Sequence, residues 1–165
     1  MTESRILSAR DIRLKIDRLA FRIMEDHHEH RDLVLIGIRQ GGHDLARLLA
    51  EAIERVDDAM DVEVRSLTLD KASPIGSVQV DVDGLDGRHV IMVDDVANSG
   101  KTLFHAFAPL VGIPMASLGI CVLVDRIHKR FPVQAEYVGM ALNTTLQEHI
   151  RVVFDAGEPT GAWLH

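Results

Sequence analysis

Several residue types and patterns are scarce in this sequence, and each shortage excludes a class of protein. Only one of the 165 residues, Cys121, is a cysteine, which excludes an intrachain disulfide framework and fits a reducing compartment. The first residues, MTESRILSAR, contain no apolar signal core, and no apolar run approaches membrane-spanning length. We therefore expect a soluble, cytoplasmic protein with no membrane partner.

Positive charge is also in short supply. The net charge is −7, and no long basic cluster interrupts the acidic background. This argues against nucleic-acid binding through a general basic field, although a local basic patch remains compatible with it. Apolar residues make up 47% of the chain and charged residues 26%, as in ordinary globular proteins. At this length we expect one domain, residues 1–165, with a sizeable core.

Apolar strands alternate with amphipathic helices along the chain. Helical spacing predicts helices over residues 8–30, with Ser8 and Asp11 as a weak capping box, and over 45–56 and 102–110. Short apolar runs predict strands over the following segments: 33–38, 61–69, 78–82, 89–93, 116–124, EYVGM and IRVVF. This alternation indicates an α/β fold with a largely parallel sheet.

Two segments lie where such a sheet binds ligands. In α/β sheets, ligands bind at the carboxyl ends of strands, in the loops that lead to helices. The loops predicted at that edge are Arg39 to Gly42 and Asp94 to Lys101. We therefore expect the functional residues to lie in these two loops.

The stretch HVIMVDDVANSGKTL, residues 89–103, ends like a nucleotide-binding phosphate loop. A Walker A loop requires a glycine five positions before Gly100, and that position is Asp95. Aspartate lacks the backbone freedom of glycine and would repel a polyphosphate. A P-loop NTPase is therefore disfavoured.

The same stretch suits a phosphorylated sugar. Backbone N–H groups, hydroxyls and a lysine between Asn98 and Thr102 form an anion site of a size for one phosphate. The carboxylates of Asp94 and Asp95 can accept hydrogen bonds from sugar hydroxyls or bind Mg²⁺. An acidic pair alone could simply end a strand. The order strand, two acids, small-residue loop and helix favours a ligand site.

VIMVDDVANSGKT resembles the phosphoribosyl-diphosphate (PRPP) signature of type I phosphoribosyltransferases. The resemblance implies that family's fold, a mainly parallel sheet flanked by helices with a small hood. It also implies that Asp94 and Asp95 bind the ribose hydroxyls and act in catalysis together with Arg39. The resemblance assigns the 5-phosphate to seven residues: Val96, Ala97, Asn98, Ser99, Gly100, Lys101 and Thr102.

The upstream loop RQGG is similar to the pyrophosphate loop of the same family. The resemblance implies that Arg39, Gln40, Gly41 and Gly42 bind pyrophosphate, with arginine as an anion ligand and the glycines allowing close backbone approach. Taken alone, the segment is equally well an ordinary turn between a strand and a helix. The PRPP-like motif downstream favours the functional interpretation.

Two longer segments resemble the PyrR group, which are pyrimidine-operon regulators with uracil phosphoribosyltransferase activity. They are ARDIRLKIDRLAFRIMED and LVDRIHKRFPVQAEYVGMALNTT. The resemblance implies a reaction that joins a nucleobase, such as uracil, to PRPP and releases pyrophosphate. It places the base near Asp125, Arg126 and His128, although the charged residues there could form only a solvated turn. The family's flexible loop would contain Lys71 and Ser73, which could equally belong to a plain hairpin loop.

The chain departs from purine-salvage members of the family at Asn98. Those members usually carry a carboxylate there, which assists proton transfer at the base, and an amide is not an effective general base. The departure disfavours a hypoxanthine–guanine enzyme and leaves base activation unassigned. The alternatives are a nucleotide-sensing regulator that binds RNA, which the acidic charge disfavours, and a non-catalytic nucleotide-binding relative.

The family also implies a cofactor and an assembly. Mg²⁺ is expected, held mainly by PRPP and not by direct protein ligands, and a homodimer or larger oligomer is expected by analogy. The segment HHEH, residues 27–30, invites a metal interpretation, but adjacent helical positions do not share a face. A solvated helix end is the favoured interpretation there.

Overall fold

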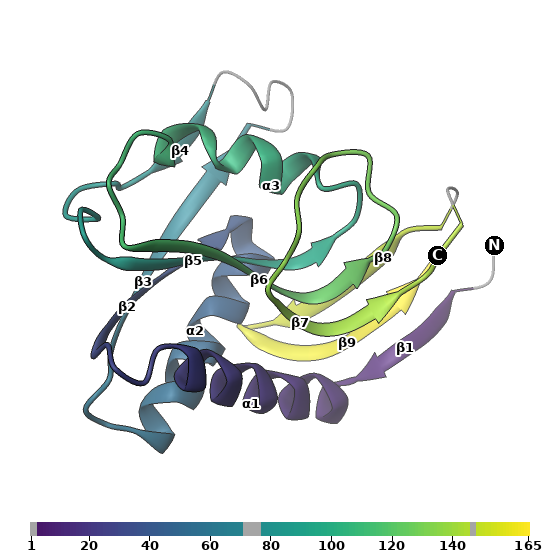
Figure 1. Ribbon diagram of the computed structural model, residues 1–165. Coiled ribbons are helices and arrows are strands. Elements are labelled where there is room, and N and C mark those ends of the chain that lie inside the picture. The colour runs from purple at the N-terminus through teal and green to yellow at the C-terminus, as the bar shows by residue number, and fades with distance from the viewer. Residues whose placement is uncertain (1–2, 71–76, 146–147) are drawn as a thin grey trace.

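The computed structural model describes residues 3–70, 77–145 and 148–165 (Figure 1). Its centre is a six-stranded sheet in the order β4-β3-β2-β5-β6-β7, parallel except for β4, which pairs antiparallel with β3. The strands of this sheet are β2 (Asp32–Ile38), β3 (Asp61–Leu69), β4 (Val78–Val80), β5 (His89–Ala97), β6 (Ser117–Arg126) and β7 (Tyr137–Leu142). The sheet confirms the predicted α/β class with largely parallel strands.

Helices cover both faces of the sheet. The long helices α1 (Ala9–Asp26) and α2 (Arg39–Val56) pack on one face, and α3 (Lys101–Ala106) and the 3₁₀ turn η1 (Ala108–Leu110) lie on the other (Figure 1). Successive strand side chains point to opposite faces, so β2 sends Leu33 and Leu35 into the α1–α2 core and Val34 and Ile36 into the α3 core. All four side chains are fully buried, which explains the continuous apolar runs in the sequence.

Helix α1 starts with the predicted capping box. The backbone N–H of Asp11 donates to the Ser8 hydroxyl at 3.2 Å, and the Asp11 carboxylate accepts from the Ser8 backbone N–H at 2.8 Å. These bonds use backbone donors that the first turn of a helix leaves without partners. Among the described helices, none is both long and apolar enough to cross a membrane.

A second, three-stranded antiparallel sheet forms the small hood. It contains β1 (Ser4–Ser8), β9 (Glu158–Leu164) and β8 (Ile150–Asp155), in the order β1-β9-β8. Ser4 pairs with Leu164, so strands from opposite ends of the described chain lie side by side (Figure 1). The sequence predicted β8 but not β1 or β9.

The direction in which successive strands are added to the sheet reverses between β2 and β5. These two strands are adjacent, with Gly37 paired to Val93. From β2 the chain continues to β3 on one side, whereas from β5 it continues to β6 and then β7 on the other side. Such a switch point separates the loops at the carboxyl ends of the two strands and leaves a crevice between them. The two segments singled out by sequence meet at this crevice.

Three predicted boundaries were wrong. Arg39–Gly42, predicted as a loop, is the first turn of α2, because β2 leads directly into that helix. Strand β5 continues to Ala97, so both acids belong to the strand, which stays paired with β6 as far as Asp125. The helix predicted to reach residue 110 breaks after Ala106 and is followed by the separate turn η1, since Pro109 has no backbone N–H to donate to the carbonyl four residues earlier.

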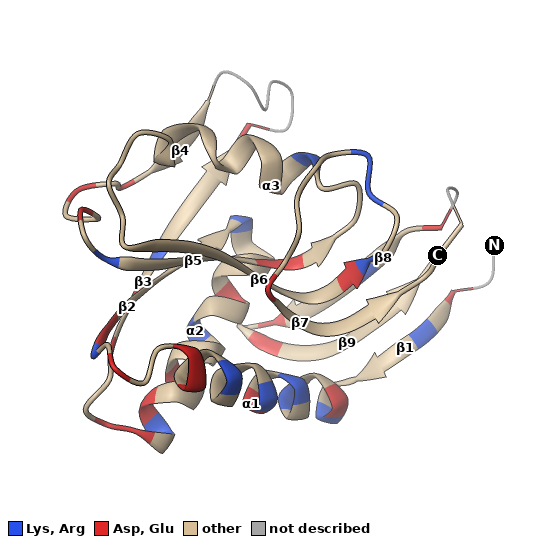
Figure 2. Ribbon diagram, in the orientation of Figure 1, with Lys and Arg blue, Asp and Glu red and all other residues tan. Residues whose placement is uncertain are grey.

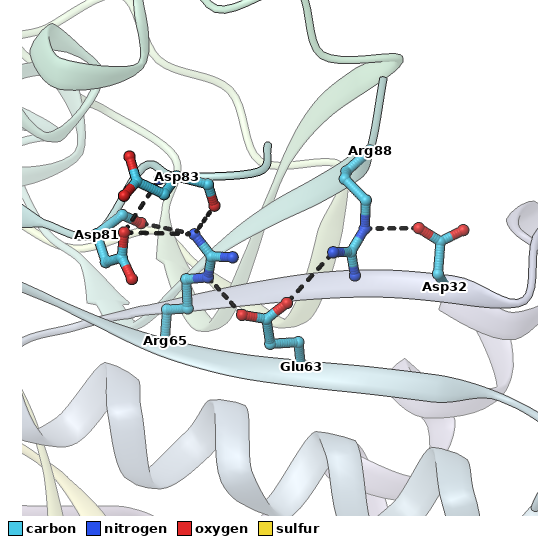
Figure 3. A network of polar contacts seen from close by, with 6 residues as sticks. All are labelled: Asp32, Glu63, Arg65, Asp81, Asp83 and Arg88. Carbon is cyan, nitrogen blue, oxygen red and sulfur yellow. Dashed lines mark hydrogen bonds and ion pairs between the residues drawn. The ribbon is translucent and has the colours of Figure 1, made fainter. Parts of the chain in front are cut away.

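A polar network joins the segment between β4 and β5 to the strands β2 and β3 (Figure 3). The Arg65 guanidinium donates to the backbone carbonyls of Asp81 and Asp83 at 2.9 and 2.8 Å, and to the Glu63 carboxylate at 2.6 Å. Glu63 also contacts Arg88, which pairs with Asp32. The network therefore joins β2 and β3 to the segments that follow β4 and precede β5, at a distance from the crevice.

Candidate active site

A cleft of about 620 Å³ opens at the switch point, which is within the usual size range of small-molecule sites. Its walls come from four places: the junction of β2 and α2, the end of β3, the end of β5 with the loop that follows, and the strand β8 of the hood. Most residues predicted to bind PRPP line it, namely Arg39, Gln40, Gly41 and the unbroken run from Asp94 to Thr102. Of the residues that line it, those at the end of β3 and those of β8 had not been predicted.

Asp94 and Asp95 lie at the end of β5, on the floor of the cleft. Asp94 is only 7% exposed, and burial, followed by the charge of Asp95, raises its pKa well above the usual range. Burial also raises the pKa of Asp95. The positive charge of Arg39 acts in the opposite direction on the pKa of each acid. Each carboxylate accepts one backbone N–H, that of Asp95 at 3.0 Å and that of Val96 at 2.9 Å. The fold therefore holds two acids together at an energetic cost that hydroxyl donors or a cation would offset.

Arg39 begins α2 in an unusual backbone conformation. Its φ angle is +56°, in the left-handed region that residues other than glycine rarely adopt, and its side chain is exposed beside the acids. Such a conformation costs of the order of 1–3 kcal/mol and commonly marks a functional site. This strain directs an exposed guanidinium to the mouth of the cleft.

Gly41 and Gly42 bring the start of α2 against β5. A Cβ atom on Gly41 would lie 2.6 Å from a carboxylate oxygen of Asp95, and one on Gly42 would lie 2.4 Å from the carbonyl oxygen of Val93. Both distances are shorter than van der Waals contact, so any side chain would push the two segments apart. The glycines are therefore what brings the Arg39–Gly42 segment beside the acidic pair.

The loop from Asn98 to Lys101 forms the next wall. Gly100 has φ +78°, which glycine adopts without strain, and the Lys101 backbone N–H donates to the Ser99 hydroxyl at 3.3 Å. The carbonyl of Ser99 accepts from the backbone N–H groups of Arg130 and Phe131 at 3.0 and 3.1 Å. The loop after β6 thus supports the loop predicted to bind phosphate.

Asn98 connects the β5 loop to the hood. Its side-chain N–H group donates to the backbone carbonyl of Ile150 at 3.4 Å, whereas its Oδ1 atom is buried without a partner among the described residues. The donor must face the carbonyl, since two oxygen atoms would repel each other. Asn98 therefore fixes one edge of the cleft against β8 and retains an unused acceptor.

The residues predicted to contact the base lie one strand away from this edge. Asp125 neighbours Ala97 on β6 and forms an ion pair with Lys129 at 2.7 Å. Arg126 is buried and donates to the Thr145 carbonyl at 2.8 Å, and His128 is exposed. None of the three lines the cleft as the described residues define it, so their role stays a prediction. Lys71 and Ser73 lie outside the described residues.

β8 supplies the wall that sequence reasoning missed. Ile150 and Val152 are buried, Arg151 between them is exposed, and all three line the cleft. Their alternation identified a strand, but its pairing with β9 brings it over the carboxyl edge of the main sheet only in the folded chain. No local signal in the sequence marks these residues as cleft-lining.

The cleft suits a cation that arrives with its ligand. No cluster of three metal-ligating side chains exists in the described ranges. Two adjacent carboxylates with raised pKa values nevertheless offer oxygen ligands of the kind that Mg²⁺ prefers, and Mg²⁺ commonly binds through one or two carboxylates together with phosphates. The residues present therefore fit Mg²⁺ that is held largely by a phosphorylated ligand.

Together, the switch-point cleft, the acidic pair and the glycine-containing loop define an α/β protein built to bind a phosphorylated sugar. Comparison with protein families agrees with this class. The chain belongs to the phosphoribosyl transferase domain family, whose model matches residues 3–158.

Proteins from several bacteria are similar over nearly the whole chain. The bifunctional protein PyrR of Streptomyces coelicolor is 35% identical over 157 residues, which cover 89% of this chain and 81% of that protein. The pyrimidine operon regulatory protein of Lactococcus lactis is 32% identical over 92% of this chain and 90% of its own length. The predicted resemblance to the PyrR group is thereby confirmed.

Solved structures confirm the predicted type I phosphoribosyltransferase fold. The hypoxanthine-guanine phosphoribosyltransferase of Bacillus anthracis superposes with a TM-score of 0.73, at 24% identity, over 90% of this chain and 87% of the other. The hypoxanthine phosphoribosyltransferase of Trypanosoma cruzi gives a TM-score of 0.74, at 24% identity, over 85% and 82% of the two chains.

Proposed function

We propose that this phosphoribosyltransferase joins a pyrimidine-like nucleobase, such as uracil, to PRPP and releases pyrophosphate. The observation that carries the proposal is the pair Asp94, which is buried, and Asp95, which is half-buried, at the switch point between the Arg39–Gly42 turn and the loop with Gly100. Acceptors for sugar hydroxyls lie there between two segments rich in anion-binding groups. That arrangement fits a sugar phosphorylated at both ends.

In this proposal Asp94 and Asp95 accept hydrogen bonds from the 2- and 3-hydroxyls of the ribose. The 5-phosphate lies in the loop from Val96 to Thr102, where backbone N–H groups, hydroxyls and the Lys101 side chain are available as donors. Binding at both ends of the sugar fixes the position of C1. Such positioning can supply a large part of the rate enhancement in group transfer.

The pyrophosphate group lies against Arg39 and the backbone of Gln40 to Gly42. The bond between C1 and the pyrophosphate oxygen breaks, a bond between C1 and a nitrogen of the base forms, and the proton of that nitrogen passes to water. Positive charge develops on the sugar as the bond to the leaving group lengthens. The carboxylates of Asp94 and Asp95 stabilise that charge, and the Arg39 guanidinium stabilises the departing anion.

Mg²⁺, when bound with PRPP, neutralises the pyrophosphate charge. The residues that would face it are Asp94 and Asp95, whose pKa values are raised mainly by burial. We further propose that the reaction takes place in the cytoplasm, in keeping with the single buried thiol of Cys121.

We place the base beside Asn98 and β8, toward Asp125, Arg126 and His128 at the end of the neighbouring strand β6 and just beyond it. The Oδ1 atom of Asn98 is buried without a partner, and its amide lacks the basicity of a carboxylate. An amide in place of a carboxylate at residue 98 favours a base that needs no carboxylate to remove its proton. A pyrimidine that acts through a readily ionised N–H group meets that requirement.

The test is a panel of nucleobases incubated with PRPP and Mg²⁺, with pyrophosphate release and the nucleotide product measured. We expect the native protein to turn over uracil. The double variant Asp94→Asn/Asp95→Asn keeps the size of both side chains but not their charge, and we expect its turnover to be at least about 100-fold lower. The matched control is Asp57→Asn/Asp58→Asn, a pair of adjacent acids outside the cleft, of which Asp57 is half-buried and pairs with Arg31. Turnover of no base by the native protein, or normal turnover by the Asp94/Asp95 variant, would contradict the proposal.

A second candidate function is a nucleotide-sensing regulator that binds RNA. The supporting observation is that similar proteins carry the name bifunctional protein PyrR. The chain has a net charge of −7, so such binding would depend on a local basic surface. Titration with pyrimidine-operon leader RNA at several salt concentrations distinguishes this function. Binding that weakens steeply with salt and responds to uridine nucleotides would support it.

A further inference from the structure

Arg151 is a basic residue of the cleft for which the proposed binding of PRPP leaves no anionic partner. The basic residues in the described lining of the cleft are Arg39, Lys101 and Arg151. In the proposed reaction Arg39 faces the pyrophosphate, and Lys101 belongs to the loop that binds the 5-phosphate. These two groups carry all the negative charge of PRPP. Arg151 is therefore left to face the other reactant, which is the base.

Arg151 also lies beside the place proposed for the base. It follows Ile150 in β8, and the backbone carbonyl of Ile150 accepts the side-chain N–H of Asn98 at 3.4 Å. Ile150 and Val152 turn into the core, whereas the side chain of Arg151 points the other way and is 61% exposed. In the described strands of the hood, β9 has no lysine or arginine, and β1 and β8 have one arginine each (Figure 2). Arg151 thus provides the positive charge on the hood side of the cleft.

The guanidinium of Arg151 is held by an ion pair that is easily exchanged. Its partner is Glu3, immediately before β1, at 3.3 Å, and the side chain of Glu3 is 45% exposed. The same oxygen of Glu3 lies 3.3 Å from a ring nitrogen of His165. Water and salt screen a pair as exposed as that of Arg151 and Glu3, so it contributes little free energy. Arg151 can therefore exchange Glu3 for an anionic atom of a ligand at little cost.

The other charged groups near this end of the cleft are already paired. On β6, Asp125 forms an ion pair with Lys129 at 2.7 Å, and Arg126 donates to the carbonyl of Thr145 at 2.8 Å. At the end of β5, Asn98 has an amide where a carboxylate would repel negative charge. This end of the cleft therefore suits a ligand atom that carries negative charge.

We propose that Arg151 is a catalytic residue that stabilises the anionic form of the base, in place of a carboxylate that would remove its proton. The role rests on the proposed function. The proton of the base nitrogen passes to water, and the resulting nitrogen anion attacks C1 as the bond to pyrophosphate breaks. Arg151 stabilises the negative charge of the base until the new bond forms.

This role also defines the class of base. A positive charge within about 4–6 Å lowers the pKa of an acid by roughly 1–3 units, so a larger fraction of the bound base is ionised near neutral pH. The effect is useful only where the N–H group is weakly acidic to begin with. The preferred substrates are therefore bases whose N–H anion is delocalised onto carbonyl oxygens.

The pH dependence of turnover tests the role of Arg151. We would measure kcat and KM from about pH 6 to 9.5 with uracil and with 5-fluorouracil, whose N–H groups are more acidic because fluorine withdraws electrons. For Arg151→Gln we expect kcat with uracil at pH 7 to fall at least about tenfold, and the rise of kcat with pH to move up by about one unit. The deficit disappears at high pH, and it does so at a lower pH with 5-fluorouracil.

Two further variants change the charge at this place in a graded way. Arg151→Lys keeps the positive charge and should restore most of the lost kcat. Glu3→Gln removes the acid beside the guanidinium, so it should move the rise of kcat to lower pH and raise kcat at pH 7 about twofold. The matched control is Arg5→Gln, which changes an exposed arginine of the hood outside the described lining of the cleft and should leave the profile unchanged.

The outcomes separate this role from a merely structural one and from the proposed function. If Arg151→Gln raised KM for PRPP equally at every pH and with both bases, Arg151 would bind the pyrophosphate and the inference would be overturned. A loss of kcat that does not depend on pH, or an unchanged profile, would also overturn it. In these cases the proposed function still stands, because the native protein turns over uracil. A native protein that turns over neither base overturns both.

Discussion

Asp94 is the residue at which binding and stability oppose each other. Its carboxylate is buried beside that of Asp95, and burial is the main reason that its pKa is raised. A raised pKa means that the folded chain retains this proton to a higher pH than the unfolded chain does. Asp94 therefore favours folding below its ordinary pKa, and this contribution is lost as the pH rises through the raised value.

Asp94→Asn should accordingly stabilise the protein and weaken its function. We expect a higher Tm at pH 8, with the gain shrinking toward pH 4, because the neutral amide removes a penalty that exists only when the acid is ionised. PRPP turnover should fall at the same time, by about 100-fold. The measurements are thermal unfolding across this pH range and the rate of pyrophosphate release. Asp58→Asn, on the surface, is the control for both, and an unchanged or lower Tm at pH 8 would contradict the explanation.

At the scale of single residues, the sequence predicted the acidic pair because its signal is local. Two acids directly after a buried strand and before Gly100 can be recognised without knowing the fold. The strain at Arg39 could not be recognised in this way, since it arises from a strand that passes directly into a helix. The same holds for Asn98, whose bond to Ile150 spans 52 positions along the chain.

At the scale of elements, the contact between α2 and β5 depends on Gly41. Gly41→Ala places a Cβ atom 2.6 Å from an oxygen of Asp95, so the first turn of α2 must move or the carboxylate must turn. We expect turnover to fall at least about tenfold, since displacements near 1 Å can have effects of this order or larger. Kinetic measurement of kcat and KM for PRPP provides the test.

The control for this substitution is Gly112→Ala. There the new Cβ meets nothing within 4 Å, but φ is +92°, so the strain is confined to the backbone. This variant should lose of the order of 1 kcal/mol of stability and keep its turnover. If Gly41→Ala remained as active as Gly112→Ala, the close approach of α2 to β5 would not matter for catalysis.

The end of α1 meets the start of β5 through three histidines. His30 stacks on His89 with ring centroids 3.9 Å apart, and His27 meets the edge of His89 at 5.2 Å. His27 is only 9% exposed, which differs from the solvated helix end that the sequence predicted. Neighbouring groups on other elements are Tyr137, 3.4 Å from His27, and Ser117, 2.7 Å from His89.

This cluster predicts a loss of stability in mild acid. Burial, followed by the charge of His89, lowers the pKa of His27, and burial, followed by His30, lowers that of His89. Asp26 and Asp32 oppose these shifts without reversing them. The folded chain therefore favours neutral rings, and their contribution is complete above the ordinary pKa of 6.5 and is lost as the pH falls below it.

The Tm should drop between pH 7.5 and pH 5.5, and His30→Gln should reduce that drop because it removes one charge from the cluster. His128→Gln changes an exposed histidine elsewhere and serves as the control. Thermal unfolding of the three proteins in matched buffers gives the comparison. A drop of equal size in the native protein and the His30 variant would remove the cluster as its cause.

The elements of the main sheet were predictable for a physical reason. Strands β2, β5 and β6 are buried along most of their length, so each leaves a continuous apolar run that is visible in the sequence, and β3 leaves an alternating pattern. β1 and β9 leave no such run, because they are short or interrupted by Pro159 and Gly161 and each gains its identity from pairing with the other. The hood, and with it the β8 wall of the cleft, was therefore out of reach of local patterns.

At the scale of the whole molecule, ligand and metal should stabilise the fold together. A ligand that binds only the folded state raises the free energy of unfolding in proportion to the logarithm of its concentration relative to Kd. We expect PRPP with Mg²⁺ to raise the Tm by several degrees, and EDTA to abolish most of the rise. Thermal unfolding with PRPP alone, Mg²⁺ alone, both, and both with EDTA is the measurement. A rise that persists in EDTA would exclude a role for the metal in PRPP binding.

The pairing of β1 with β9 has a consequence for the time at which the protein becomes active during its synthesis. β1 leaves the ribosome before the main sheet, yet its partner β9, with Leu164 opposite Ser4, is made after the main sheet. The main sheet, from β2 to β7, can assemble while translation continues, since chains begin to fold from the N-terminus. The strand β8, which closes the cleft, becomes anchored only when β9 emerges. A nascent chain therefore carries its acidic pair and the loop proposed to bind phosphate for some time before it has a closed cleft in which to use them.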